Sequence, residues 1–259
     1  MITAEEISQY RKDGYVVIED VFSVAECAEL RQYASDVVRG DIALSGGNTV
    51  VMEPDALEKG LTEGGDAEYL FKIGHQMHMT DAVFQKFAVH PKLKTILASL
   101  IGPDVKCVQS MYLDKPPELG VGQPYHQDAW YLKTDPDSLM AVWIACDDAT
   151  LENGCLFVVP GSQNDPVHPH EEPLEPAQRR TFVEVHQARE RDEKMVSIKT
   201  GSAVFFGGHV LHRSGHNTSS SHRRSYVLHY ADAKSKWLND PEAKNPFLLV
   251  IGQEYPGKV

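Results

Sequence analysis

Residues 140–159 read MAVWIACDDATLENGCLFVV, and this stretch decides the predicted fold. Two short apolar runs, Met140–Cys146 and Cys155–Val159, flank a polar segment. Short runs rich in β-branched and aromatic residues between turn-forming residues are typical of strands. The pair Asn153-Gly154 lies between the two runs, and because this dipeptide favours the tight turns of β-hairpins, it predicts that the two strands pair.

The same pattern extends outward from this stretch over the second half of the chain. Further strand-like runs, separated by Pro, Gly, Asn and Asp, are Val105–Leu113, Met195–Ile198, Ala203–Phe206 and Ser225–Tyr230. Many short strands with regular turn signals indicate an antiparallel double-sheet barrel or jelly roll. The chain is therefore predicted to be mainly β.

The first 104 residues are predicted to form a helical flank with one strand. Thr3 to Glu6 and Ser23 to Glu26 fit capping boxes, which mark helix N-termini. The other expected segments are a helix end at Gly14, a strand over Tyr15–Ile18, a surface loop over 41–68 and helix over Asp81–Leu100 restarting at Pro91. We expect one domain over 1–259, with the flank at 1–104, a jelly-roll core at 105–235, an insertion at 163–193 and a tail at 236–259.

Composition limits the partners of the chain. The 259 residues are 42% hydrophobic, and 25 basic against 37 acidic residues give a net charge of −12. An acidic surface repels phosphate backbones and anionic lipids, so we expect a small-molecule substrate and neither nucleic acid nor membrane as partner. The four cysteines form no C-x-x-C pair, which favours reduced thiols and a cytoplasmic location. Nothing in the sequence indicates the oligomeric state.

The sharpest chemical signal is Tyr125-His126-Gln127-Asp128. On an extended segment, residues two apart point to the same face, so His126 and Asp128 can direct a nitrogen and a carboxylate oxygen to one point. Two histidines and one carboxylate on one face of an iron(II) ion leave three positions open for oxygen and a cosubstrate. An H-x-D triplet alone is common, and the hypothesis therefore requires a third ligand.

The segment 207–217 contributes three histidines. If residues 209–214 are extended, His212 shares a face with Ser214, whereas His209 lies on the other face. His212 is thus paired with a hydroxyl that could bind an adjacent anion. Eleven residues later comes Arg223, whose planar guanidinium matches a carboxylate. A dicarboxylate that chelates iron through a 2-oxo acid group needs such a partner at its far end.

These motifs together resemble the phytanoyl-CoA dioxygenase family, and the similarity covers nearly the whole chain. The residues that carry it are Gly14–Val17, Pro124–Asp128, Trp143–Ala145, Asp148–Cys155, Pro160–Ser162, His212–Asn217 and Arg223. The 148–155 run looks most like the subgroup called phytanoyl-CoA dioxygenase domain-containing proteins. The resemblance implies a double-stranded β-helix of the cupin-like 2-oxoglutarate oxygenase type.

The resemblance also implies a role for each site residue. His126, Asp128 and His212 would bind iron(II), and the catalytic centre would be built on them. Arg223 and Ser214 would bind the distal carboxylate of 2-oxoglutarate. The other residues expected to line the cosubstrate are Lys72, Gln109, Met111 and Trp143. The implied activity is a 2-oxoglutarate-dependent dioxygenase that uses O2 to hydroxylate an unactivated C–H bond, with release of succinate and CO2.

Three further expectations concern the surroundings of this site. Arg213 stands where many relatives carry Gly, and on a strand it would point away from the metal. Trp130, Tyr131 and the 41–68 loop flank the H-x-D segment or its approaches and are expected to form substrate-pocket walls. Because Asp128 is retained, halogenation is disfavoured.

Two alternative functions stay open on the sequence alone. One is a jelly-roll module that binds a metal or ligand without turnover. The other is a cupin-type oxygenase that needs no 2-oxo acid, which would call for a tighter cluster of three histidines. Neither alternative accounts for Arg223, so the 2-oxoglutarate-dependent dioxygenase is preferred.

Overall fold

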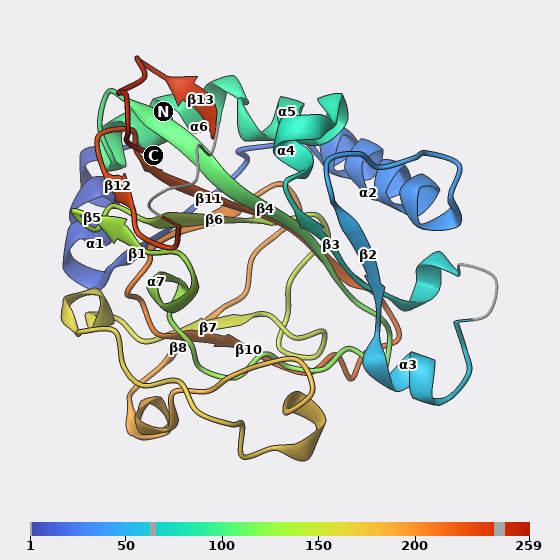
Figure 1. The fold of residues 1–259 in the computed structure, drawn as a ribbon. Coiled ribbons are helices and arrows are strands. Elements are labelled where there is room, and N and C mark those ends of the chain that lie inside the picture. Colours follow the sequence, from blue (N-terminus) through green and yellow to red (C-terminus); the bar gives the residue numbers. More distant parts are fainter. Residues whose placement is uncertain (1, 63–65, 241–246) are drawn as a thin grey trace.

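Two sheets that face each other form the centre of the molecule (Figure 1). The structure is a computed structural model that describes residues 2–62, 66–240 and 247–259. The large sheet has the order β1-β9-β6-β11-β4-β3-β2, with β13 also paired to β4, and the small sheet has the order β10-β7-β8. The ladders between the described strands are all antiparallel. The predicted jelly-roll fold is confirmed.

The strands have the following bounds. Those of the large sheet are β1 (Tyr15–Ile18), β2 (Thr49–Met52), β3 (Leu70–His75), β4 (Val105–Lys115), β6 (Met140–Ala145), β9 (Ala203–Gly207), β11 (Arg223–Asp232) and β13 (Leu248–Ile251). Those of the small sheet are β7 (Leu156–Val158), β8 (Lys194–Val196) and β10 (His212–Ser214). The short strands β5 (Thr134–Asp135) and β12 (Lys236–Trp237) pair with each other.

Helices cover the face of the large sheet that points away from the small sheet (Figure 1). They are α1 (Ala4–Asp13), α2 (Val24–Arg39), α4 (Met77–Thr80), α5 (Ala82–Ala88) and α6 (Pro91–Leu100). Both predicted capping boxes are present, because the Thr3 and Ser23 side chains accept from the backbone N–H groups three residues on. Helix α1 ends at Gly14, whose φ of 82° places it in the left-handed region that glycine adopts without strain.

Strand β11 separates the hydrophobic core from the cavity. Its residues Tyr226, Leu228 and Tyr230 are buried in the core under the helices. The alternate residues Arg223, Val227 and His229 line a cavity between the two sheets. Because successive side chains of a strand point to opposite faces, one strand can serve packing and chemistry at once. One cavity wall is therefore built on a central and largely buried strand of the sheet.

The predicted hairpin at Asn153-Gly154 is wrong. Strand β6 pairs with β9 and β11 in the large sheet, whereas β7 pairs with β8 and β10 in the small sheet. The Asn153 side chain instead closes a local turn, accepting from Thr150 N at 2.8 Å and donating to Asp148 O at 2.7 Å. The turn signal was correct, but the chain uses this turn while crossing from one sheet to the other.

The predicted surface loop at 41–68 is also partly wrong. It contains strand β2, helix α3 (Pro54–Glu58) and the start of a short 3-10 helix, η1 (Ala67–Tyr69). Strand β2 is an edge strand whose four side chains are exposed or half-buried, so the segment lacks the apolar alternation by which strands are recognised. The C-terminal segment 236–259 likewise contributes β12 and β13.

The segment between β7 and β8 runs across the small sheet and contains three short 3-10 helices. These are η2 (Ser162–Asn164), η3 (Pro176–Gln178) and η4 (His186–Glu190). All four cysteines are buried and free. Among the described residues no helix combines the length and apolar character needed to cross a membrane.

Candidate active site

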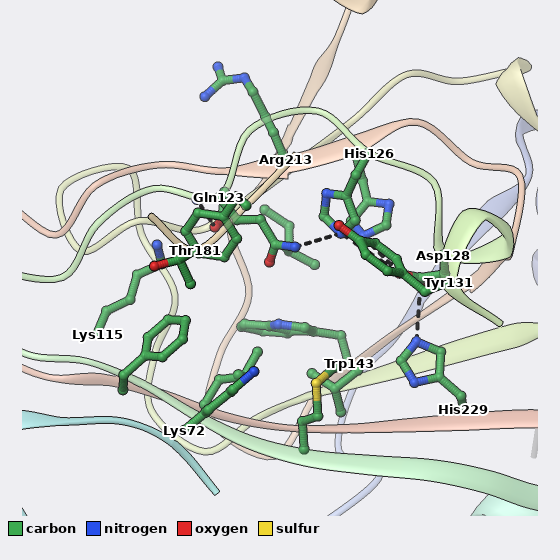
Figure 2. Close-up of a pocket in the computed structure, with 18 of the residues that line it drawn as sticks. Lys72, Lys115, Gln123, His126, Asp128, Tyr131, Trp143, Thr181, Arg213 and His229 are labelled. Atoms are coloured by element: carbon green, nitrogen blue, oxygen red, sulfur yellow. Dashed lines mark hydrogen bonds and ion pairs between the residues drawn. The ribbon is translucent and has the colours of Figure 1, made fainter. Parts of the chain in front are cut away.

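A cavity of about 220 Å³ lies between the two sheets (Figure 2). Its walls come from β3, β4, β6, β7, β9, β10 and β11, from the segment around the H-x-D triplet and from Thr181 and Phe182 of the insertion. Apolar side chains such as Leu156, Phe206 and Val227 make up much of the wall. The polar groups gather towards its two ends.

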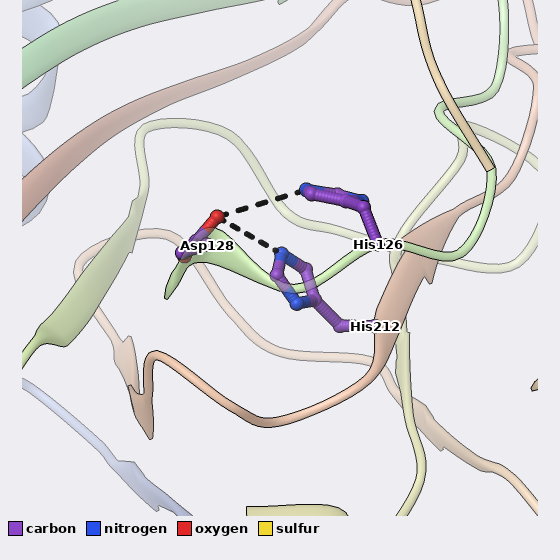
Figure 3. Close-up of side chains that lie close together, drawn as sticks. All are labelled: His126, Asp128 and His212. Atoms are coloured by element: carbon purple, nitrogen blue, oxygen red, sulfur yellow. Dashed lines mark ion pairs between the residues drawn. The ribbon is translucent and has the colours of Figure 1, made fainter. Parts of the chain in front are cut away.

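His126, Asp128 and His212 converge at one end of this cavity (Figure 3). One potential ligand atom from each residue lies within 4.8 Å of the other two, and all three side chains are buried. Asp128 Oδ1 is 3.7 Å from His126 Nε2 and 3.8 Å from His212 Nε2. The convergence expected from the sequence is therefore present.

An isolated antiparallel bridge between the backbones of His126 and His212 brings the two motifs together. His126 N donates to His212 O at 3.0 Å, and His212 N donates to His126 O at 3.1 Å. The extended conformation of the H-x-D segment ends at Gln127, because Asp128 is the first residue of a short helix, α7 (Asp128–Tyr131). The bridge sets the two imidazoles side by side, with ring centroids 4.1 Å apart.

The protonation of both histidines suits a metal. In each ring Nδ1 lies 2.9 Å from the carbonyl oxygen two residues earlier, Pro124 O for His126 and Val210 O for His212. A carbonyl oxygen only accepts, so each Nδ1 must carry the proton, and each Nε2 presents a lone pair to the centre. The Gln123 amide is 2.9 Å from His126 Nε2, which agrees with this tautomer.

The charges at this end also suit a divalent cation. Burial lowers the pKa of His126 to about 3, so its ring is neutral near pH 7. Burial alone would raise the pKa of Asp128, but the nearby His212 and His229 bring that pKa below its usual value, and the carboxylate stays ionised. Two neutral nitrogens and one anionic oxygen, with other positions open, form the donor set of non-haem iron(II) oxygenases.

His229 fixes the carboxylate from the other side. Its Nε2 is 3.1 Å from Asp128 Oδ2, so one oxygen faces His229 while Oδ1 faces the two histidines (Figure 2). Such outer contacts orient a metal-binding carboxylate. Alternation from Arg223 places His229 on the inner face, but nothing in the sequence pairs it with a residue 101 positions away.

Arg223 is buried in the same cavity without an anionic partner. Its side chain is 2% exposed, its guanidinium lies 5.3 Å from the Trp143 ring centre, and Nη1 donates to Ser225 Oγ at 2.9 Å. Nε has no hydrogen-bond partner, and none of the described carboxylates forms an ion pair with Arg223. Burial lowers the pKa of Arg223 to about 10, so it is still charged at pH 7. A buried cation of this kind calls for an anion from a bound molecule.

The remaining residues expected at the cosubstrate all line this cavity. They are Lys72, Gln109, Met111, Trp143 and Ser214. Ser214 Oγ accepts from Gln123 N at 3.2 Å. Sequence motifs assign no role to five further residues of the cavity wall, which are Lys115, Gln123, Thr181, Phe182 and His229. Binding roles for these residues stay predictions.

Two of the three features predicted to form substrate-pocket walls do not line the cavity. Tyr131 lines the cavity, but Trp130 is 38% exposed and stacks on His170 with ring centres 4.7 Å apart. The first turn of α7 turns these neighbouring side chains in different directions. None of the described residues of 41–68 lines the cavity, because this segment lies at the outer edge of the large sheet.

Arg213 points away from the metal end, as the sequence predicts (Figure 2). Its guanidinium makes two hydrogen bonds to Glu193, at 2.8 and 2.6 Å, and lies 3.8 Å from the Phe157 ring centre. It therefore ties the end of the insertion to the small sheet.

Comparison with known proteins identifies the family. The family model for phytanoyl-CoA dioxygenase matches residues 10–225. A Caenorhabditis elegans homolog of phytanoyl-CoA dioxygenase domain-containing protein 1 is 31% identical, over 90% of this chain and 94% of that protein. The Danio rerio protein of that name is 28% identical, over 93% and 96%.

Solved structures share the fold. The α-ketoglutarate-dependent carbocyclase SnoK superposes with a TM-score of 0.73 at 21% identity, covering 96% of both chains. EctD from S. alaskensis with bound Fe gives a TM-score of 0.72 at 22% identity, covering all of this chain and 87% of EctD. Another EctD structure contains 2-oxoglutarate and 5-hydroxyectoine. The chain belongs to the phytanoyl-CoA dioxygenase family.

Proposed function

We propose that this chain is an iron(II)- and 2-oxoglutarate-dependent dioxygenase that hydroxylates an unactivated C–H bond of a small organic molecule. Substrate, O2 and 2-oxoglutarate would give hydroxylated substrate, succinate and CO2. The observation that carries the proposal is a single cavity with the His126–Asp128–His212 cluster at one end and the unpaired Arg223 guanidinium in its wall. Bound iron would couple decarboxylation of the 2-oxo acid to oxidation of the substrate.

The residues of the chain would bind, orient and enclose the reactants. His126, Asp128 and His212 would hold the metal, and His229 would keep Asp128 Oδ1 turned towards it. Arg223 and Ser214 would bind the distal carboxylate of 2-oxoglutarate, with Lys72, Gln109, Met111 and Trp143 along its length. The apolar wall keeps water away and strengthens these charged contacts.

Arg223 also weighs against the two alternative functions. A metal-binding module without turnover and an oxygenase without a 2-oxo acid both leave a buried guanidinium with no use for its charge. The cytoplasmic location expected from the sequence stays a prediction.

Anaerobic addition of 2-oxoglutarate to the iron(II)-loaded protein tests the proposal. A metal-to-ligand charge-transfer absorption should appear, because the 2-oxo acid chelates the iron, and it should be absent when either component is left out. Subsequent exposure to O2 should release succinate. An iron-loaded protein that shows no such absorption would exclude the proposed function.

Substitution of His229 tests its support of Asp128. His229→Leu should weaken iron(II) binding roughly 10–100-fold, the usual effect of losing a residue that orients a metal ligand. His229→Gln places an amide donor near the position of Nε2 and should restore much of the affinity. Anaerobic equilibrium dialysis measures both constants, and equal affinities for wild type and the leucine variant would show that Asp128 needs no such support.

A further inference from the structure

A second buried basic side chain stands beside Arg223. Lys115 is the last residue of β4 and is the direct cross-strand partner of Arg223 on β11. Partners in an antiparallel pair point to the same face, and both side chains line the cavity. Lys115 is 6% exposed and Arg223 is 2% exposed. In Figure 2, Lys115 lies across the cavity from His126 and Asp128.

Burial and the neighbouring Arg223 charge hold the pKa of Lys115 well below its usual range, so two charged side chains side by side are unfavourable here. Like charges directly opposite each other on neighbouring strands are destabilising, and burial makes the repulsion stronger. None of the described carboxylates forms an ion pair with Lys115. Glu53 is the carboxylate that favours the charged lysine, but its two oxygens have no hydrogen-bond partner and burial raises its own pKa to about 7. An anion bound between the two side chains would relieve the unfavourable pairing and favour the charged form of Lys115.

The fold holds Lys115 on the cavity wall. Its Nζ donates to Val121 O, and its backbone carbonyl accepts from Asn217 Nδ2 at 2.8 Å. The 116–122 loop closes tightly over it, since a Cβ on Gly120 would lie 2.5 Å from Lys115 Cβ. The same loop packs on β10, where a Cβ on Gly122 would lie 2.7 Å from Ser214 O. The ammonium group is therefore fixed near the predicted carboxylate-binding residues Arg223 and Ser214.

We propose that Lys115 is a second cation for the distal carboxylate of the 2-oxo acid and acts with Arg223 to select a dicarboxylate. This inference rests on the proposed function. A carboxylate has two oxygens and up to four acceptor positions, so it can receive the guanidinium fork and an ammonium together. A 2-oxo acid that ends in a methyl group would leave both buried cations unpaired and would bind poorly.

The test compares two 2-oxo acids of equal length. Iron(II)-loaded wild type, Lys115→Met and Lys115→Arg are titrated anaerobically with 2-oxoglutarate and with 2-oxovalerate, which lacks the distal carboxylate. In Lys115→Met the Kd for 2-oxoglutarate should rise roughly 10–100-fold, as expected for losing a hydrogen-bonded charge pair. The Kd for 2-oxovalerate should change less than about twofold, and Lys115→Arg should keep most of the preference for the dicarboxylate.

Two outcomes overturn the inference. Equal loss of affinity for both acids would assign Lys115 to support of the 116–122 loop, and unchanged affinity for 2-oxoglutarate would leave it no part in cosubstrate binding. Wild type that binds neither acid contradicts the proposed function itself, so the two failures are distinguishable.

A second variant keeps the test decisive if Lys115→Met does not fold, which circular dichroism would show. Arg223→Met should still prefer 2-oxoglutarate to 2-oxovalerate by roughly tenfold, because Lys115 remains. Complete loss of the preference in Arg223→Met alone would show that Lys115 contributes nothing to it.

Discussion

Replacing Asp128 with alanine should abolish 2-oxoglutarate-dependent succinate release. Asp128 supplies the anionic atom of the cluster, and its Oδ1 lies 3.7 Å from His126 Nε2 and 3.8 Å from His212 Nε2. Losing a metal ligand should lower activity by more than the roughly 10–100-fold that follows from losing a residue that only orients a ligand. The variant should also bind less than one equivalent of iron(II) in anaerobic dialysis, which separates loss of the metal from loss of the fold.

A matched surface variant provides the control. Asp192 is exposed in the insertion, and Asp192→Ala should retain both iron and turnover. Circular dichroism and thermal melting of the two variants check that each is folded. Normal succinate release by Asp128→Ala would remove the His126–Asp128–His212 cluster from consideration as the iron site.

The features that could be predicted from the sequence are those set by near neighbours. The capping boxes at Thr3 and Ser23 depend on a residue three positions away, and both are present. The opposite facing of His212 and Arg213 follows from strand alternation, and in the structure His212 faces Asp128 whereas Arg213 bonds to Glu193. Local spacing alone does not predict that His126, Asp128 and His212 converge, because the two motifs lie far apart in the chain. The resemblance to a known family supplied their pairing.

The features that could not be predicted depend on strand register and sheet assignment. Whether Lys115 lies opposite Arg223 is decided by how β4 pairs with β11, and this register includes an irregularity between His229 and Tyr230. The hairpin prediction failed for the same reason. Asn153-Gly154 indicates a turn correctly, but the partner of each strand is chosen by burial across the whole molecule.

Substitution of Arg223 by methionine should have the second-largest effect. The Kd for 2-oxoglutarate should rise roughly 100-fold or more, because the fully buried guanidinium would make two charge-assisted hydrogen bonds with the distal carboxylate. Arg223→Lys should recover only part of this affinity, since an ammonium lacks the planar fork. The absorption that accompanies anaerobic cosubstrate binding measures each constant.

The stability of the ligand-free variant distinguishes a binding role from a structural one. In the ligand-free protein Arg223 is a buried cation with no ion-pair partner among the described residues and with Lys115 opposite it. Replacing it with an apolar side chain of similar length should therefore raise the free energy of unfolding by about 1 kcal/mol or more. A residue kept for binding at the expense of stability is expected at a functional site. If Arg223→Met instead unfolds more easily and binds 2-oxoglutarate as wild type does, the guanidinium serves the fold, and the cosubstrate carboxylate must bind elsewhere.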